Sequence, residues 1–132
     1  MIMPLLNGLK ITLQHLFKKP VTLQYPDEKQ PVSARYRGLH ALKVSHDQAK
    51  CVACYLCPTV CPAKCITVEA GETESHDKYA DVYEIDILRC IFCGYCVEAC
   101  PVDALKMTGE YELANYKRED FLFGKQTLLE KK

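Results

Sequence analysis

Hydrophobic residues in the first part of the chain recur at the spacing of one helix face. The apolar positions are Ile2, Leu5, Leu6, Leu9, Leu13, Leu16 and Phe17. The opposite face carries Asn7, Lys10, Gln14 and Lys18. This pattern predicts an amphipathic helix over residues 1–20. Its polar residues interrupt any run of the about 20 apolar residues that a membrane-spanning helix needs, so the helix is not expected to cross a bilayer.

The next segment, residues 21–41, has a different character. Pro26 and Pro31 lie within it, after Pro20, among mixed polar residues. Proline fixes its own φ and removes a backbone donor, so this segment is expected to be an extended connector. At the other end, residues 113–132 are compatible with a helical tail. The apolar residues available for packing there are Phe121, Leu122, Leu128 and Leu129.

Short runs of β-forming residues lie between these ends, at 42–45, 66–69, 83–87 and 105–108. The polar stretch at 70–80 separates the second run from the third and predicts a surface loop. A block of cysteines follows the first run and another follows the third. The order strand, cysteine loop, short helix, strand therefore occurs twice, and residues 42–112 are expected to form one α+β domain with an internal repeat.

The two cysteine blocks share one spacing. The first is Cys51, Cys54, Cys57 and Cys61 followed by Pro62, and the second is Cys90, Cys93, Cys96 and Cys100 followed by Pro101. Thiolates are the soft ligands of iron–sulfur clusters, and this spacing is typical of proteins with two [4Fe-4S] clusters. In such proteins the fourth cysteine of each run ligates the other cluster.

The spacing rule gives a ligand set for each cluster. It assigns Cys51, Cys54, Cys57 and Cys100 to the first cluster, and Cys90, Cys93, Cys96 and Cys61 to the second. Pro62 and Pro101 are expected in the first turn of a following helix, where a missing N–H costs nothing. Structural zinc is an alternative, but a zinc ribbon uses two cysteines per knuckle and does not explain two runs of four.

The composition limits the possible binding partners and the cellular compartment. The 132 residues carry 17 Lys and Arg against 17 Asp and Glu, so the net charge is zero and no basic field favours nucleic acid. No basic n-region, sustained apolar core or small-residue cleavage site of a secretory signal begins the chain. With nine cysteines, an odd number, this favours reduced thiols in the cytoplasm over a disulfide scaffold.

Other candidate residues receive minor roles. Cys65, the ninth cysteine, is either a spare ligand or a small core residue, and the core role is favoured. No metal role is assigned to His15, His40, His46 or His76. Water is expected to be excluded from the clusters by Tyr55, Ile91, Phe92 and Tyr95. No nucleophile–base pair, phosphate-binding loop or flavin motif occurs. Neither catalytic residues nor a small-molecule substrate are therefore expected.

With these motifs placed, the sequence resembles the ferredoxin-type subunit I of respiratory complex I, the NADH:quinone oxidoreductase. The likeness is strongest over residues 83–105, YEIDILRCIFCGYCVEACPVDAL. It extends to RYRGLHAL at 35–42, to the amphipathic N-terminus, and to the tail sequence YKREDFLFGKQTLL. The resemblance implies a ferredoxin-like fold with pseudo-twofold symmetry in which all eight motif cysteines bind two [4Fe-4S] clusters.

The resemblance also implies a role. In a proton-translocating NADH:quinone oxidoreductase, the subunit would relay electrons from an upstream cluster-bearing subunit to the terminal cluster that reduces quinone. Its expected partners are those two neighbours, the membrane arm, and the membrane surface, which residues 1–20 would contact on the cytoplasmic face. Two alternatives stay open: a subunit of a membrane-bound hydrogenase or another complex-I-like enzyme, and a free two-cluster ferredoxin.

Overall fold

The computed structural model describes residues 2–45, 48–73 and 76–129. The chain divides into two compact units, an N-terminal unit, Met1–Pro31, and a core unit, Val32–Lys132. Each is described by itself.

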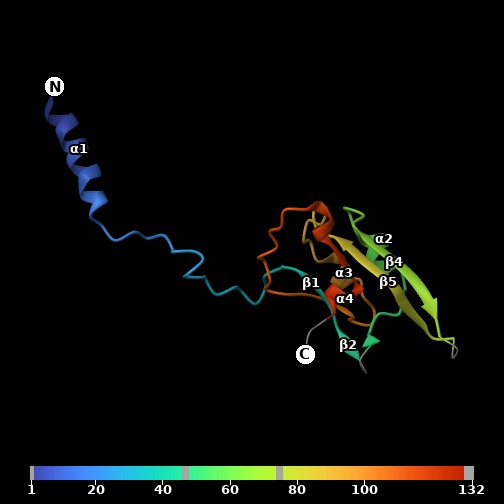
Figure 1. Ribbon diagram of the computed structural model, residues 1–132. Helices are drawn as coiled ribbons and strands as arrows, with labels where there is room; N and C mark the ends of the chain where they lie inside the picture. The colour runs from blue at the N-terminus through green and yellow to red at the C-terminus, as the bar shows by residue number, and fades with distance from the viewer. Residues whose placement is uncertain (1, 46–47, 74–75, 130–132) are drawn as a thin grey trace. The chain divides into compact units, whose positions relative to one another are not determined.

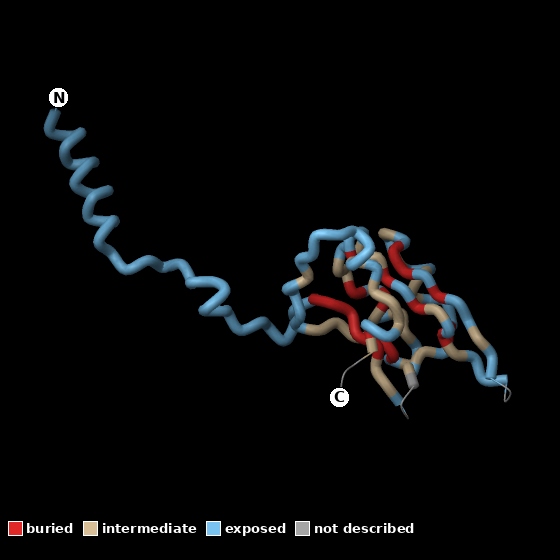
Figure 2. Tube along the Cα trace, viewed as in Figure 1, coloured by how far each residue is buried: buried red, intermediate tan, exposed pale blue. Residues whose placement is uncertain are grey.

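The N-terminal unit contains helix α1 (Ile2–Leu16) (Figure 1). Its apolar residues follow the predicted helix face, although Phe17 comes after the helix end. None of its residues is buried (Figure 2), and Leu5 and Leu16 expose 73% and 74% of their surface. Residues 17–31 form turns and irregular backbone. In the part of the chain that the structure describes, no helix is both long and apolar enough to span a bilayer.

The core unit is built from short strands and short helices. In chain order these are β1 (His40–Leu42), β2 (Val44–Ser45), β3 (Gln48–Ala49), α2 (Leu56–Val60), β4 (Ile66–Glu72), β5 (Lys78–Asp86), α3 (Tyr95–Glu98), β6 (Leu105–Met107), the 3-10 helix η1 (Arg118–Phe121), β7 (Leu122–Gly124) and α4 (Lys125–Leu128). Strands β4, β5 and β7 form one sheet, while β1 pairs with β6 and β2 with β3. The predicted α+β class is confirmed.

Strands β4 and β5 form the longest ladder of the core unit. They pair antiparallel from Ile66↔Ile85 at one end to Glu72↔Lys78 at the other. The surface loop predicted at residues 70–80 is therefore wrong for most of that stretch. Its polar side chains suggested a loop, but the ladder hydrogen bonds join backbone groups and tolerate polar residues on an exposed face.

Gly71 also argued for a loop, and the structure shows why a strand accepts it. Gly71 faces Tyr79 across the ladder. A Cβ atom at this position would lie 2.6 Å from Cζ of Tyr79, so the tyrosine ring covers the glycine. A strand glycine often marks such a close approach.

Strands β1 and β6 pair antiparallel, with His40 opposite Met107 and Leu42 opposite Leu105. All three residues of β1 are buried. Figure 2 shows this as a continuous red stretch. The cysteine-bearing loops are thereby attached at both ends to paired strands.

The pairing extends beyond β1 in the N-terminal direction. The amide of Gly38 donates to Thr108 O at 2.9 Å, and a Cβ atom on Gly38 would lie 2.2 Å from Glu110 O. Only glycine permits this approach. The connector predicted over residues 21–41 therefore ends too late, because the core unit begins at Val32 and residues 38–41 are joined to the end of the β6 segment. The prolines of the segment suggested a connector throughout, but the short, mostly apolar run at its end is buried in the sheet.

The helical tail predicted over residues 113–132 is wrong as a continuous helix. The described part contains a 3-10 turn, strand β7 and one turn of helix, while residues 130–132 lie outside the described residues. Strand β7 pairs with β5 through Glu84↔Gly124 and Asp86↔Leu122. A free edge of β5 offers unpaired backbone groups, and pairing with them outweighs a weak helix propensity.

Buried side chains form one hydrophobic cluster. Its members are Leu39, Leu42, Ala53, Cys65, Ile66, Val68, Ala80, Tyr83, Ile85, Ile87, Cys96, Leu105 and Leu128. Four further cysteines pack against it, namely Cys51, Cys57, Cys61 and Cys90. The cysteine loops are therefore part of the core rather than appendages to it.

Leu128 tests whether the tail supports this core, since its side chain is 1% exposed whereas Leu122 is 55% exposed. We expect Leu128→Ala to lower the free energy of unfolding by about 2–5 kcal/mol, because it leaves a cavity. Leu122→Ala should change it by less than about 0.5 kcal/mol. Anaerobic guanidinium chloride unfolding followed by circular dichroism measures both. Equal effects of the two variants would contradict the packing of the tail.

Candidate metal centres

The two cysteine loops follow the same backbone course. Residues with positive φ occur at equivalent positions: Ala53, Tyr55 and Lys64 in the first block, and Phe92, Gly94 and Asp103 in the second. A left-handed conformation costs an ordinary L-residue about 1–2 kcal/mol. Backbone strain of this kind persists where the surroundings enforce it and is concentrated at functional sites. Here it turns the chain so that successive cysteines face one place.

Short helices follow these turns. Helix α2 contains Cys57 and begins after Tyr55, while α3 contains Cys96 and begins after Gly94. The expectation that Pro62 and Pro101 begin helices is wrong, because each lies in a turn after its helix has ended. Proline cannot supply the N–H that a continuing helix needs, and so it ends the helix instead.

The eight motif cysteines line two pockets. A pocket of about 330 Å³, partly open to solvent, is lined by Cys51, Cys54, Cys57 and Cys100. A pocket of about 320 Å³ is lined by Cys61, Cys90, Cys93 and Cys96. The lining of each pocket includes three cysteines of one loop and the fourth of the other. The ligand sets given by the spacing rule stay a prediction. Cys96 also reaches the first pocket.

Hydrogen bonds are directed at several of these sulfur atoms. The amide of Phe92 donates to Cys90 Sγ at 3.3 Å, and the amide of Ala104 donates to Cys100 Sγ at 3.2 Å. The hydroxyl of Tyr83 donates to Cys57 Sγ at 3.7 Å. Donors of this kind stabilise negative charge on sulfur, and in iron–sulfur proteins they help to set the reduction potential.

Burial raises the pKa of four of these thiols. Desolvation is the largest cause, and it raises the pKa of Cys57 to about 11 and that of Cys96 to about 12. The pKa values of Cys51 and Cys90 are raised as well. A buried thiolate is poorly solvated, whereas a bound metal cation deprotonates a coordinating thiol outright. These thiols therefore suit metal ligation better than free nucleophilic chemistry.

Cys65 is buried in the core, as predicted, and its Sγ lies 3.5 Å from Cys61 Sγ. Burial raises the pKa of Cys65. The pKa of Cys61 is lowered, since hydrogen bonds from Cys65 and from neighbouring amides outweigh burial. The two sulfur atoms are within hydrogen-bond distance of one another, and either can be the donor. Cys65 also lines the second pocket.

His40 is a pocket residue that the sequence did not single out. It is 2% exposed, lines the second pocket, and its ring centroid lies 6.0 Å from that of Phe92. Burial lowers its pKa, so the imidazole is neutral. Its Nδ1 has no hydrogen-bond partner among the described residues, and leaving such an atom unpaired costs about 1–3 kcal/mol. His15 and His76 are exposed, and His46 lies outside the described residues.

Arg37 is a second residue without a sequence signal of its own. Its guanidinium donates to the backbone oxygen of Cys93 and lies 3.9 Å from the carboxylate of Glu98. Gly94 lies directly beneath it, because a Cβ atom there would be 3.3 Å from Arg37 Cζ. The arginine thus holds the turn between the second and third cysteines of the second loop.

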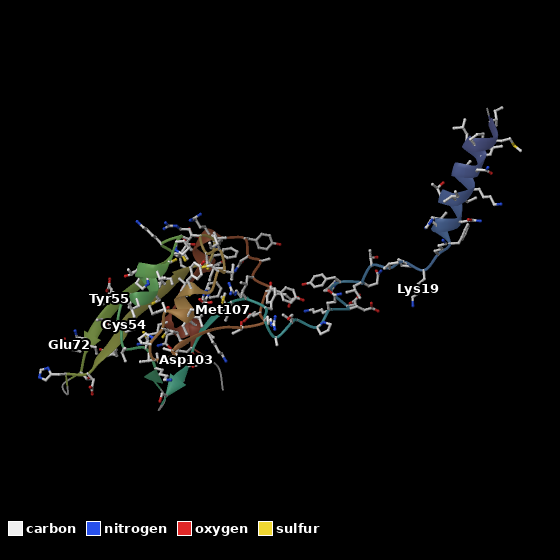
Figure 3. The ribbon with its side chains drawn as sticks, turned by 180° about the vertical axis from the view of Figure 1, so that it is seen from behind. Lys19, Cys54, Tyr55, Glu72, Asp103 and Met107 are labelled. Atoms are coloured by element: carbon white, nitrogen blue, oxygen red, sulfur yellow. The ribbon has the colours of Figure 1, made fainter. Side chains whose placement is uncertain are left out.

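The expectation that four side chains exclude water from the cysteines is met by only one of them. Tyr55, Ile91 and Tyr95 expose 46%, 64% and 52% of their surface. Phe92 is half-buried and packs against the core. Figure 3 labels Tyr55 beside Cys54 at the start of α2. The tyrosine hydroxyl accepts a hydrogen bond from the amide of Ala70 at 3.1 Å.

The spread of the sulfur atoms bears on the choice of metal. Within residues 2–45, 48–73 and 76–129, no three His, Cys, Asp or Glu side chains converge closely enough to hold a single ion. A zinc site needs four ligands about 2.0–2.3 Å from one ion. A cluster of four irons takes one thiolate at each of four separated corners. The cysteine thiolates that line each pocket are a donor set that fits a [4Fe-4S] cluster.

The chain is similar to known iron–sulfur proteins. The 4Fe-4S binding domain family matches residues 83–106. NADH-quinone oxidoreductase subunit I 2 of Geobacter metallireducens is 80% identical over 131 residues, which cover 99% of this chain and 100% of that protein. NADH-quinone oxidoreductase subunit I 1 of Geobacter sulfurreducens is 82% identical over 132 residues, covering 100% of both chains.

A solved structure shares the fold. One chain of the membrane-bound sulfane sulfur reductase, an archaeal respiratory membrane complex, is 38% identical and superposes with a TM-score of 0.57. The likeness covers 83% of this chain and 55% of that one, so this chain spans about half the length of its structural relative. Together with the 4Fe-4S match, it supports the predicted ferredoxin-like fold.

Proposed function

The chain belongs to the NADH-quinone oxidoreductase subunit I family, and from that premise we propose that it relays electrons within a membrane-associated NADH:quinone oxidoreductase. The prediction of an iron–sulfur electron-transfer subunit is confirmed by its relatives and by its 4Fe-4S domain. The observation that carries the proposal is the gathering of eight cysteines around two pockets.

The proposal includes two [4Fe-4S] clusters. Cys51, Cys54, Cys57 and Cys100 would hold the first, and Cys90, Cys93, Cys96 and Cys61 the second. When bound, such clusters supply reversible one-electron chemistry. The chain supplies the remainder: the core excludes water on one side of each pocket, and amide and hydroxyl donors directed at sulfur bias the electron affinity.

We further propose that the two halves are related by a pseudo-twofold axis. The equivalent left-handed residues support this, and so does the strand register. Leu105 and Ile66 follow the last cysteines of their blocks by the same number of residues. Leu105 pairs with Leu42, and Ile66 pairs with Ile85. A rotation that exchanges the halves would thus carry the β1–β6 pair onto the β5–β4 pair.

The membrane is the proposed partner of α1. Its apolar face is exposed along the whole helix, and the opposite face carries Lys10. An amphipathic helix of this kind lies in the membrane interface with its apolar face inserted. We place the subunit peripherally on the cytoplasmic face, between an upstream cluster-bearing subunit and the subunit with the terminal cluster. Proton translocation would be carried out by the membrane arm.

A second candidate function has the same cluster-binding core but a different electron donor to the whole complex. It is supported by the 38% identity to a chain of a sulfane sulfur reductase, since one iron–sulfur fold occurs in respiratory membrane complexes with different reactions. In that case the chain would relay electrons in a complex that does not oxidise NADH.

Purification of the tagged, full-length chain from native membranes under anaerobic conditions separates these candidates. We expect a large assembly that reduces quinone with NADH, because the relay requires both neighbours. Co-purifying subunits, iron content and NADH-dependent quinone reduction are measured together. A large assembly without NADH activity would support the second candidate. A small brown soluble protein would identify a free ferredoxin and contradict the proposal.

A variant without residues 2–19 tests the membrane role of α1. We expect it to retain about eight irons per chain, because every cysteine lies in the core unit, and to appear in the soluble fraction. Membrane fractionation and iron analysis are the measurements, with the full-length chain as control. Membrane attachment unchanged by the deletion would refute the anchoring role.

Cys100→Ser tests the crossed ligand sets. We expect loss of the first cluster, and therefore about half of the roughly eight irons, although Cys100 belongs to the second block. The electron paramagnetic resonance (EPR) spectrum of the reduced variant should match that of Cys54→Ser and differ from that of Cys93→Ser. The opposite match would exclude the crossing. Cys61 is the poorer choice because Cys65 Sγ lies 3.5 Å from its sulfur.

A further inference from the structure

His40 places a polar atom where an apolar side chain would otherwise suffice. Its neighbours Leu39, Ala41 and Leu42 are all buried, so this is a strand of the hydrophobic core. Within the described residues, Nδ1 of His40 is buried and reaches no donor or acceptor, cysteine sulfurs included. Polar atoms in protein cores are normally hydrogen-bonded. The imidazole therefore needs a partner that the described residues do not supply.

The strand register gives an independent indication of what that partner is. Met107 follows Cys100 by the same number of residues as Val68 follows Cys61. Met107 pairs with His40, and Val68 pairs with Tyr83. His40 and Tyr83 therefore occupy equivalent positions, one at each pocket. Tyr83 donates its hydroxyl proton to a sulfur atom, Sγ of Cys57. The equivalent ring at the second pocket is expected to serve sulfur as well.

Water is a poor candidate for the missing partner. The second pocket has apolar walls, including Ile66, Ile85 and Ile91, and a buried water needs two to four polar partners. Iron is a poor candidate too, because a cube needs four protein ligands and the four motif cysteines at this pocket already supply them. The remaining candidates for the partner of Nδ1 are the sulfide ions of the cluster, which carry no proton and can accept a hydrogen bond.

We propose that Nδ1–H of His40 donates a hydrogen bond to a sulfide of the second [4Fe-4S] cluster and raises the reduction potential of that cluster. This inference rests on the proposed function, since it requires the second pocket to hold a cluster. Reduction adds one negative charge to the cluster, so a directed N–H dipole stabilises the reduced form more than the oxidised form. The neutral imidazole has one such N–H to give.

His40→Phe removes both ring nitrogens while keeping an aromatic ring in the core. In the full-length chain with both clusters built anaerobically, we expect the equilibrium constant for reduction of the second cluster to fall about tenfold. For a one-electron couple this is a shift of about 59 mV to lower potential. The first cluster should shift by less than a third of that. EPR-monitored redox titration measures both potentials, with signals assigned from the Cys100→Ser and Cys93→Ser variants.

Tyr83→Phe is the matched control, because it removes the donor at the equivalent position of the first pocket. We expect the reverse pattern there, a lower potential for the first cluster and an unchanged second. His40→Gln retains an amide donor and should recover part of the lost potential. Equal shifts of both clusters in His40→Phe would indicate a general loss of packing and overturn the proposal, as would no shift in either cluster.

A measurement on the unaltered sequence does not depend on the folding of any variant. With ¹⁵N at the histidine nitrogens, pulsed EPR of the reduced second cluster should detect a nitrogen coupling that His40→Phe abolishes. Absence of this coupling in a chain with both clusters present overturns the role of His40 and leaves the proposed function intact. Absence of the clusters themselves would overturn both proposals, and iron analysis distinguishes the two cases.

Discussion

The core unit depends on one constraint: sulfur atoms from two distant stretches of chain have to reach the same pocket. Cys100 lines a pocket with Cys51, Cys54 and Cys57, and Cys61 lines one with the second loop. Two antiparallel pairings make this possible, because β1–β6 and β4–β5 fix the ends of both loops. Within the loops, strained left-handed residues direct the sulfurs inward. The strain persists because buried strands on both sides enforce it.

The same frame carries different side chains at its two pockets. Tyr83 stands at the first and His40 at the equivalent position of the second. Cys65, whose thiol points toward Cys61, and Arg37, which holds the Cys93 carbonyl, are both associated with the second pocket. Reduction potentials respond to hydrogen bonds, charge and solvent exposure around a cluster. A repeated backbone can therefore produce two sites with unequal electron affinity through a few substitutions on fixed positions.

Local spacing made the cysteine loops predictable, because a run of four cysteines encodes its own loop geometry. The helix at Ile2–Leu16 was predictable for the same reason, since its periodicity is local. The pairing between distant strands was not predictable from the sequence. The sequence suggested a loop at residues 70–80 because their side chains are polar, yet residues 70–72 of β4 pair with residues 78–80 of β5. Residues 122–124 read as helix, yet the open edge of β5 takes them as a strand. His40 had no pattern at all, because its role depends on what lies across the sheet.

In the proposed function, the two units divide two physical tasks. All nine cysteines lie in the core unit, and the exposed apolar helix lies in the N-terminal unit. Holding a metal cluster requires a rigid, dry pocket whose geometry tolerates little movement. Contact with a membrane requires only apolar area and a polar rim, and it tolerates considerable variation in position. The two tasks therefore impose no common geometry on one another.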